Sequence, residues 1–268
     1  MAIRIGISGC RYAPWRGVFY PAALPQRREL EHASGCFRSI EINGSFYSLQ
    51  SPKSWQAWRD ATPDGFVFAV KGPRYLTHML RLRGFETPLS NFLASGLLKL
   101  GDRLGPILWQ LPPNFAFDAG RLEAFLGALP RDTGEALKLA RRRDVALMRG
   151  RSALAIDRVR PLRHALEPRH ESFGSREALV LLRRHGVALV AADTAGKFPC
   201  FDVATADFSY VRLHGGTQLY VSGYSKRELA TWAGRIRRWA ERGDVFCYFD
   251  NDAKVHAPFD AQALMELL

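Results

Sequence analysis

The chain has 268 residues, of which 47% are hydrophobic, 24% charged and 12% aromatic, and its formal net charge is +12. This composition supplies a large core and excludes a disordered chain, and no uncharged apolar run is long enough to cross a membrane. Cys10, Cys36, Cys200 and Cys247 lie far apart, and the N-terminus lacks an apolar signal core. We therefore expect a cytoplasmic protein with reduced thiols that is not in the membrane.

Short apolar runs recur along the chain, and helix-like stretches follow them. Several runs are continuously apolar, which is typical of parallel strands covered on both faces. The predicted strands are Ile3–Ile7, Ser39–Ile42, Phe66–Val70, Ile107–Gln110, Arg163–Glu167, Val187–Ala191, Phe208–Leu213 and Val245–Phe249. Eight strands alternating with helices predict an α/β fold, a single (β/α)8 TIM-type barrel domain over residues 1–268, with an open doubly wound sheet as the alternative.

Capping residues mark where the intervening helices begin. Four N-caps are predicted, including a capping box, together with a final helix capped by Asp260. The predicted caps and their helices are Ser51 before Lys53–Asp60, Asp118 before Leu122–Leu129, Ser175 before Glu177–His185, Ser225 with Glu228 before a helix ending at Gly243, and Asp260 before Ala261–Leu268.

Two connections are longer than a simple crossover. The first contains a polar loop and a helix predicted near Leu89–Leu104, and the second carries a helical insertion before the fifth strand, Glu135–Val159. Arginine runs in this insertion and elsewhere are typical of solvated helix surfaces, although the overall positive charge would also attract polyanions or an anionic substrate.

Polar side chains collect at the carboxyl ends of the predicted strands, where parallel barrels carry their chemistry. Glu41, Gln110 and Arg212 interrupt apolar strands, where an unpaired polar group is costly, so we expect them to share a network at the barrel mouth. The candidate catalytic residues are Glu41, Asp193, His214 and Asp250. The candidate substrate-binding residues are Asn43, Lys71, Arg74, His78, Trp109, Gln110, Glu167, Arg169, Arg212 and Asn251.

Motifs spread over nearly the whole chain carry a family resemblance. They are Gly6-Ile7-Ser8-Gly9, Trp15-Arg16-Gly17, Glu41-Ile42-Asn43-Gly44-Ser45-Phe46-Tyr47, Lys71-Gly72-Pro73-Arg74, Leu108-Trp109-Gln110-Leu111-Pro112-Pro113, Glu167-Pro168-Arg169-His170-Glu171-Ser172-Phe173, Ala192-Asp193-Thr194, Tyr210-Val211-Arg212-Leu213-His214-Gly215 and Tyr248-Phe249-Asp250-Asn251-Asp252. The sequence thereby resembles the YecE-like family, domain of unknown function 72. The resemblance implies a barrel and no established reaction, and Cys10 stands where the family motif has Trp.

Three functional hypotheses remain open, and the sequence does not decide whether the protein is an enzyme. The first is an enzyme acting on a phosphorylated or sugar-like anion, with arginine and lysine binding the anion and carboxylates transferring protons. The second is a metal-assisted hydrolase or nuclease that uses a divalent metal held by carboxylates and imidazole. The third is a non-catalytic protein that binds nucleic acid or another anion.

No cofactor is predicted, because glycine-rich nucleotide fingerprints and the short metal-ligand motifs are absent. The sequence does not indicate an oligomeric state. Lys71, Arg74, Arg169 and Arg212 come from three different strand ends, so in a barrel they converge. We expect a phosphate, sulfate or carboxylate group to bind near Lys71 and Arg74, and Arg74→Ala to weaken that binding by ~1.5–3 kcal/mol.

Overall fold

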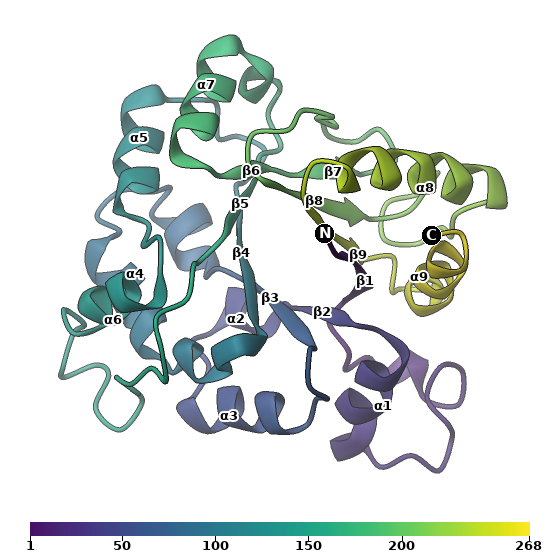
Figure 1. Ribbon diagram of the computed structural model, residues 1–268, viewed down its shortest axis with the longest axis horizontal. Helices are drawn as coiled ribbons and strands as arrows, with labels where there is room; N and C mark the ends of the chain where they lie inside the picture. The colour runs from purple at the N-terminus through teal and green to yellow at the C-terminus, as the bar shows by residue number, and fades with distance from the viewer.

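The computed structural model describes residues 1–268 and contains nine strands, all paired in parallel. The strands are β1 (Ile3–Ser8), β2 (Ser39–Ile42), β3 (Val67–Lys71), β4 (Leu104–Gln110), β5 (His164–Glu167), β6 (Ala188–Leu189), β7 (Ala191–Asp193), β8 (Phe208–Leu213) and β9 (Asp244–Phe249). They lie at the centre of the molecule with the helices around them (Figure 1).

The strands form a nearly closed barrel. Their order is β6-β5-β4-β3-β2-β1-β9-β8-β7, so neighbours in the sheet follow chain order around the ring. Only Val190 separates β6 from β7, so the two ends of the sheet are consecutive pieces of the chain. This order excludes the doubly wound alternative, in which the strand order reverses. The predicted count of eight was wrong by one because the sixth strand is interrupted at Val190.

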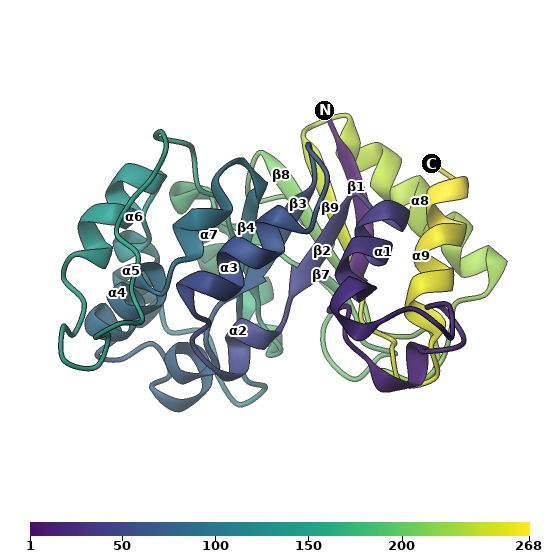
Figure 2. The same ribbon diagram turned by 90° about the horizontal axis from the view of Figure 1, so that it is seen from below.

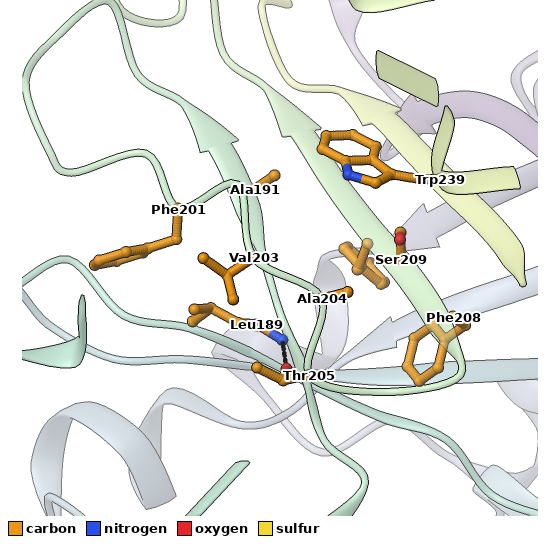
Figure 3. Close-up of a pocket in the computed structure, with 10 residues that line it drawn as sticks. Leu189, Ala191, Phe201, Val203, Ala204, Thr205, Phe208, Ser209 and Trp239 are labelled. Carbon is orange, nitrogen blue, oxygen red and sulfur yellow. Dashed lines mark hydrogen bonds between the residues drawn. The ribbon is translucent and has the colours of Figure 1, made fainter. Parts of the chain in front are cut away.

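The interruption is stabilised by a side chain from a later segment. Thr205 accepts a hydrogen bond from the Leu189 backbone N–H at 2.8 Å (Figure 3). It also donates one to the Val187 carbonyl at 2.7 Å. Its hydroxyl therefore satisfies backbone groups that lack a strand partner. The hollow beside it has a volume of about 10 Å³, which is too small for any ligand larger than a water molecule.

Nine α-helices surround the strands, and none is both long and apolar enough to cross a lipid bilayer. They are α1 (Glu29–Cys36), α2 (Gly44–Tyr47), α3 (Pro52–Asp60), α4 (Glu86–Ala94), α5 (Ala119–Ala128), α6 (Thr133–Ala140), α7 (Arg176–His185), α8 (Lys226–Ala240) and α9 (His256–Glu266). In the side view, α4, α5 and α6 gather at one end of the molecule and α1, α8 and α9 at the other (Figure 2).

The predicted N-caps at Ser51, Asp118, Ser175 and Ser225 are confirmed. Each side chain accepts a hydrogen bond from a backbone N–H in the first turn of its helix, and Ser225 forms the full capping box with Glu228. Such caps satisfy backbone donors that have no partner inside the helix.

Four helix predictions need correction. The helix predicted near Leu89–Leu104 ends at Ala94, because Gly96 adopts a φ of 101° and a 3-10 segment follows over Leu97–Arg103. The helix after Ser225 ends at Ala240 rather than Gly243. The last helix begins at His256, so Asp260 lies inside it and accepts from Tyr224 N and Asn251 Nδ2. In the predicted helical insertion only α6 is helical, and residues 141–163 form turns and extended chain.

The core has two parts, inside and outside the ring of strands. Side chains alternate along each strand, so every second residue faces inward. Small and aromatic side chains fill the inside, among them Ala69, Ala165, Ala192, Tyr210 and Tyr248. A larger apolar cluster packs between the strands and the helices. The barrel interior is therefore filled by side chains, which leaves its carboxyl-terminal mouth as the place for a site.

Candidate functional site

A polar layer lies above the apolar barrel interior, at the last inward position of most strands. It consists of Ser8, Glu41, Lys71, Gln110, Glu167 and Arg212, with Asp250 directly after β9. The strand register places Ser8 beside Glu41 and Gln110 beside Glu167. The same alternation that buries Tyr210 and Tyr248 therefore brings these polar groups together from strands far apart in the sequence.

Arg212 lies at the centre of this layer and is completely buried. Its Nη2 lies 2.8 Å from Glu41 Oε1 and 2.9 Å from Asp250 Oδ2, and its Nη1 lies 2.8 Å from Glu167 Oε2. A planar guanidinium with several donors can serve three carboxylates in this way, whereas a lysine could not match the geometry. Arg212 has its donors committed to the protein, so it is not free to bind a substrate anion.

Glu41 has both carboxylate oxygens occupied. Its Oε2 accepts from Tyr210 OH at 2.6 Å and from Arg212 Nε at 3.1 Å, while Oε1 accepts from Ser8 Oγ and Arg212 Nη2. Because the side chain is fully buried and has no free lone pair facing the mouth, this arrangement favours a structural role over acid–base work.

Glu167 and Asp250 complete the cluster as ionised groups. Burial alone would raise their pKa values, but Arg212 and the other cations nearby lower the pKa of Glu167 well below its usual range and that of Asp250 to about 2. His214 lies 3.1 Å from Asp250 through Nδ1 and 3.4 Å from Arg212 Nη1 through Nε2. Gln110 donates to Glu167 at 2.7 Å.

Lys71 lies on the other side of the mouth and has no carboxylate within 4.0 Å. Only 8% of this residue is exposed, and its Nζ lies 4.3 Å from the centre of the Phe46 ring. Burial and the charge of Arg212 together lower the pKa of Lys71 to about 8, against the opposing effect of Glu167, Glu41 and Asp250. A buried ammonium without an ion pair is costly to the fold.

His78 lies beside the same phenylalanine, on the one-turn π-helix η3 (Tyr75–Met79). Its ring centre is 5.1 Å from that of Phe46, and its Nδ1 is 2.9 Å from Thr77 Oγ1. Burial and three cations, Lys71, Arg169 and Arg74, together lower the pKa of His78 to about 4, against the opposing effect of Glu167. The imidazole is therefore neutral at pH 7 and lies in a positive field.

Arg169 and Arg74 supply that field from two different loops. Arg169 Nε lies 3.2 Å from Glu167 and its Nη2 donates to Tyr220 OH at 3.2 Å, which leaves Nη1 without a protein partner. Arg74 is exposed, makes no ion pair and precedes η3 directly. Lys71 ends β3, Arg74 follows β3 and Arg169 follows β5, and all three lower the pKa of His78. Arg212, which was predicted to bind the same anion, is instead committed to carboxylates.

The carboxylates are not arranged to hold a metal ion. No group of three or more His, Cys, Asp or Glu side chains has the geometry of a metal site. Glu41, Glu167 and Asp250 surround Arg212, and a metal ion would have to compete with the guanidinium for the same oxygens. These carboxylates already have a cation from the chain itself, the Arg212 guanidinium.

Comparison with known sequences assigns the chain to a family. A family model described as "Protein of unknown function DUF72" matches residues 4–268. The chain belongs to the DUF72 family. It is 25% identical to the UPF0759 protein YecE of Escherichia coli K12 over 87% of this chain and 81% of that protein, and 22% identical to the UPF0759 protein YunF of Bacillus subtilis 168 over 93% and 89%.

Solved structures agree with the barrel described above. A DUF72 family protein from Thermotoga maritima matches with a TM-score of 0.78 and 25% identity over 100% of this chain and 99% of that one. D-psicose 3-epimerase from Clostridium cellulolyticum matches with a TM-score of 0.52 and 14% identity over 99% and 97%. The second likeness shows the fold alone.

Three of the residues predicted for the mouth lie elsewhere in this DUF72 protein. Trp109 is fully buried among Phe92, Phe125 and His164 outside the strands, and donates to His164 Nδ1 at 3.2 Å. Asp193 follows the inward Ala192, so it faces outward and accepts from Ala195 N.

Asn251 is also outside the mouth. It is fully buried and donates to the Ser222 carbonyl at 2.9 Å and to Asp260 at 2.8 Å. It therefore connects α9 to the loop that precedes α8. Asn43 remains at the mouth, where it donates to Ser8 Oγ at 2.8 Å.

Three residues in or beside the site were not among the predicted candidates, although Ser8 and Asp252 lie at predicted strand ends. Ser8 bridges Glu41, Asn43 and Arg212, and Tyr210 donates to Glu41. Asp252 lies near Asp250, and burial together with the Asp250 charge raises its pKa to about 6. Ser8 and Tyr210 share the inward parity of Glu41 and Arg212, and this signal could have identified them.

Proposed function

We propose that the barrel mouth is the active site of an enzyme that binds an anionic small molecule through Lys71 and Arg169, with Arg74 at the entrance. The observation that carries the proposal is the buried Lys71 ammonium, which lies against the Phe46 ring with no carboxylate within 4.0 Å and with His78 on the same ring. Such an arrangement lacks a stabilising partner in the protein, and a phosphate or carboxylate group would supply it.

The neutral His78 fits this role. Because its pKa is about 4, it adds no charge at pH 7, and its N–H can donate a hydrogen bond to a bound oxyanion. An anion placed there would be shared by Lys71 and Arg169, whose Nη1 has no partner in the protein. The phenylalanine under Lys71 excludes water from one side and strengthens the interaction.

Asp252 is the proposed acid–base group, and Asp250, which is engaged with Arg212 and His214, acts on it through its charge. Asp250 stays ionised because its pKa is about 2, and its charge helps to keep the pKa of Asp252 near 6. A carboxyl group that titrates close to neutrality can both accept and donate a proton at working pH. This assignment replaces Glu41, Asp193, His214 and Asp250 as first choices. Glu41 and Asp250 are engaged with Arg212, His214 is engaged with Asp250, and Asp193 faces outward.

Calorimetric titration with inorganic phosphate tests the proposal. The wild-type protein should bind phosphate, and Lys71→Met should weaken binding about tenfold or more because a charged hydrogen bond is lost. Lys53→Met, which removes an exposed lysine on α3, is the matched control and should bind as the wild type does. Equal phosphate affinity of wild type and Lys71→Met, or no binding at all, would contradict the proposal.

A further inference from the structure

An open groove lies next to the anion site, between α2, η3, α4 and the turn region that follows α6. Its volume is about 570 Å³, within the range of pockets that hold small ligands. Phe46 and Arg74 line it, and Phe46 also lies against Lys71 and His78. The groove is therefore adjacent to the proposed anion-binding residues.

The lining of this groove is unusually apolar for an exposed surface. Five large side chains lie in it and remain exposed: Tyr47 at 71%, Met79 at 64%, Leu147 at 57%, Tyr75 at 48% and Leu49 at 41%. Arg74 is the one charged residue in the lining, and no acidic residue belongs to it. Clustered exposed apolar side chains of this kind mark binding surfaces.

The part of the predicted insertion Glu135–Val159 that follows α6 forms one wall of the groove through Leu147. Asp144 N donates to Asn91 Oδ1 on α4 at 2.8 Å, and Leu147 N donates to Asp144 Oδ1 at 2.9 Å. Ala153 N donates to the carbonyl of Ala94 at 2.9 Å. These bonds fix the segment that carries Leu147 against α4, which gives the insertion a role beyond its surface charge.

We propose that this groove binds the base of a nucleoside monophosphate whose phosphate lies at Lys71 and Arg169. The inference rests on the proposed function and names its substrate class. Tyr47, Tyr75 and the Arg74 guanidinium present flat groups on which an aromatic base stacks. The chain lacks a glycine-rich nucleotide fingerprint, so side chains rather than a backbone cradle hold the phosphate.

A calorimetric series separates the contributions of phosphate, sugar and base. Its ligands are inorganic phosphate, ribose 5-phosphate, adenosine 5′-monophosphate, hexyl phosphate and a trinucleotide. Adenosine 5′-monophosphate should bind roughly tenfold or more tightly than ribose 5-phosphate, because stacking of its base on aromatic side chains adds to the binding free energy. Hexyl phosphate should bind less tightly than the nucleotide, because an alkyl chain has no ring face to stack.

Variants locate the effect in the groove. Tyr75→Ala and Leu147→Ser should reduce the nucleotide affinity toward that of ribose 5-phosphate and leave inorganic phosphate binding unchanged. Val180→Ser is the matched control, since Val180 is 53% exposed on α7 and does not line the groove. A thermal melt of each variant shows that it is folded.

The outcomes distinguish this inference from the proposed function. If the wild type binds inorganic phosphate and shows no preference for the nucleotide, the inference alone is overturned. If the wild type binds neither inorganic phosphate nor any of the phosphorylated ligands, both the inference and the proposed function are overturned. A hexyl phosphate affinity above that of the nucleotide would assign the groove to an aliphatic group and contradict the inference. A trinucleotide that binds far more tightly than the monophosphate would also contradict it, by making the groove a nucleic-acid surface.

Discussion

The two sides of the barrel mouth differ in how their charges are satisfied. Around Arg212, three carboxylates and a serine hydroxyl surround one guanidinium, all within 3.1 Å of it. Around Lys71, a buried ammonium faces an aromatic ring and a neutral histidine, with no carboxylate in contact. Both groups are cations at the ends of barrel strands, yet only the first is balanced by the protein.

This difference separates structure from function within one layer of side chains. A buried charge with a complete set of partners holds strands together and has no capacity left for a ligand. A buried charge without partners destabilises the fold, and such a group persists where a ligand supplies the missing partner. Substitutions on the two sides should therefore change stability in opposite directions.

Removing the guanidinium should have the largest effect. Arg212→Met leaves Glu41, Glu167 and Asp250 buried without their cation, so we expect a loss of about 3–5 kcal/mol in the free energy of unfolding. Urea denaturation at pH 7 measures this loss. Arg28→Met, which breaks the exposed pair with Glu31, should change stability by less than about 1 kcal/mol. A similar small change in Arg212→Met would show that the cluster does not hold the barrel together.

Removing the ammonium should have the opposite sign. The pKa of Lys71 falls from 10.5 to about 8, which at about 1.4 kcal/mol per pKa unit corresponds to roughly 3 kcal/mol of lost stability at pH 7. Lys71→Met should therefore stabilise the protein by about this amount, measured by urea denaturation at pH 7. A destabilised Lys71→Met variant would mean that Lys71 has a structural partner.

The pH dependence of the stability difference between Lys71→Met and the wild type gives a further check. Between pH 8 and 10.5 the unfolded chain holds the Lys71 proton and the folded protein has lost it, so the wild type gains stability as pH rises through this window. In the unfolded chain tyrosines and cysteines also titrate in this window, whereas burial raises their pKa values in the folded protein. Comparison with Lys71→Met cancels their contribution. The stability gap between variant and wild type should shrink from pH 8 to 10.5, and a constant gap would contradict the lowered pKa.

The smallest effect belongs to Arg74. The structure leaves this side chain exposed at the entrance, so water screens its charge. Arg74→Ala should weaken phosphate binding by about 0.5–1 kcal/mol, or roughly two- to fivefold, which is less than the 1.5–3 kcal/mol expected from a charged hydrogen bond. Calorimetry would contradict this ranking if Arg74→Ala lost as much affinity as Lys71→Met.

The strands could be predicted from the sequence because each is a compact apolar run with a polar end. The split at Val190 could not, since it depends on the Thr205 hydroxyl, which reaches the strand from a later segment. The last helix was mispredicted because Asp260 resembles an N-cap. In the structure Asp260 lies inside α9 and accepts hydrogen bonds from Tyr224 N and Asn251 Nδ2, which are outside the helix.

The site was predictable to the extent that strand alternation was applied. Trp109 and Gln110 are neighbours in β4, so only one of them can face the mouth, and the structure turns Gln110 inward. The prediction that Glu41 and Arg212 share a network is confirmed. That the hydrogen-bonding groups of both side chains are all occupied within the protein depends on distances that a sequence does not contain.

NMR of the His78 imidazole during a pH titration shows whether the Lys71 side of the mouth is a positive site without an anion. The free protein should show a pKa of about 4, since burial and the cations Lys71, Arg169 and Arg74 disfavour the imidazolium. Saturating inorganic phosphate should raise that pKa clearly, because a bound anion offsets the positive field. An ordinary His78 pKa near 6.5 in the free protein, or a pKa that does not move when phosphate is added, would contradict the account.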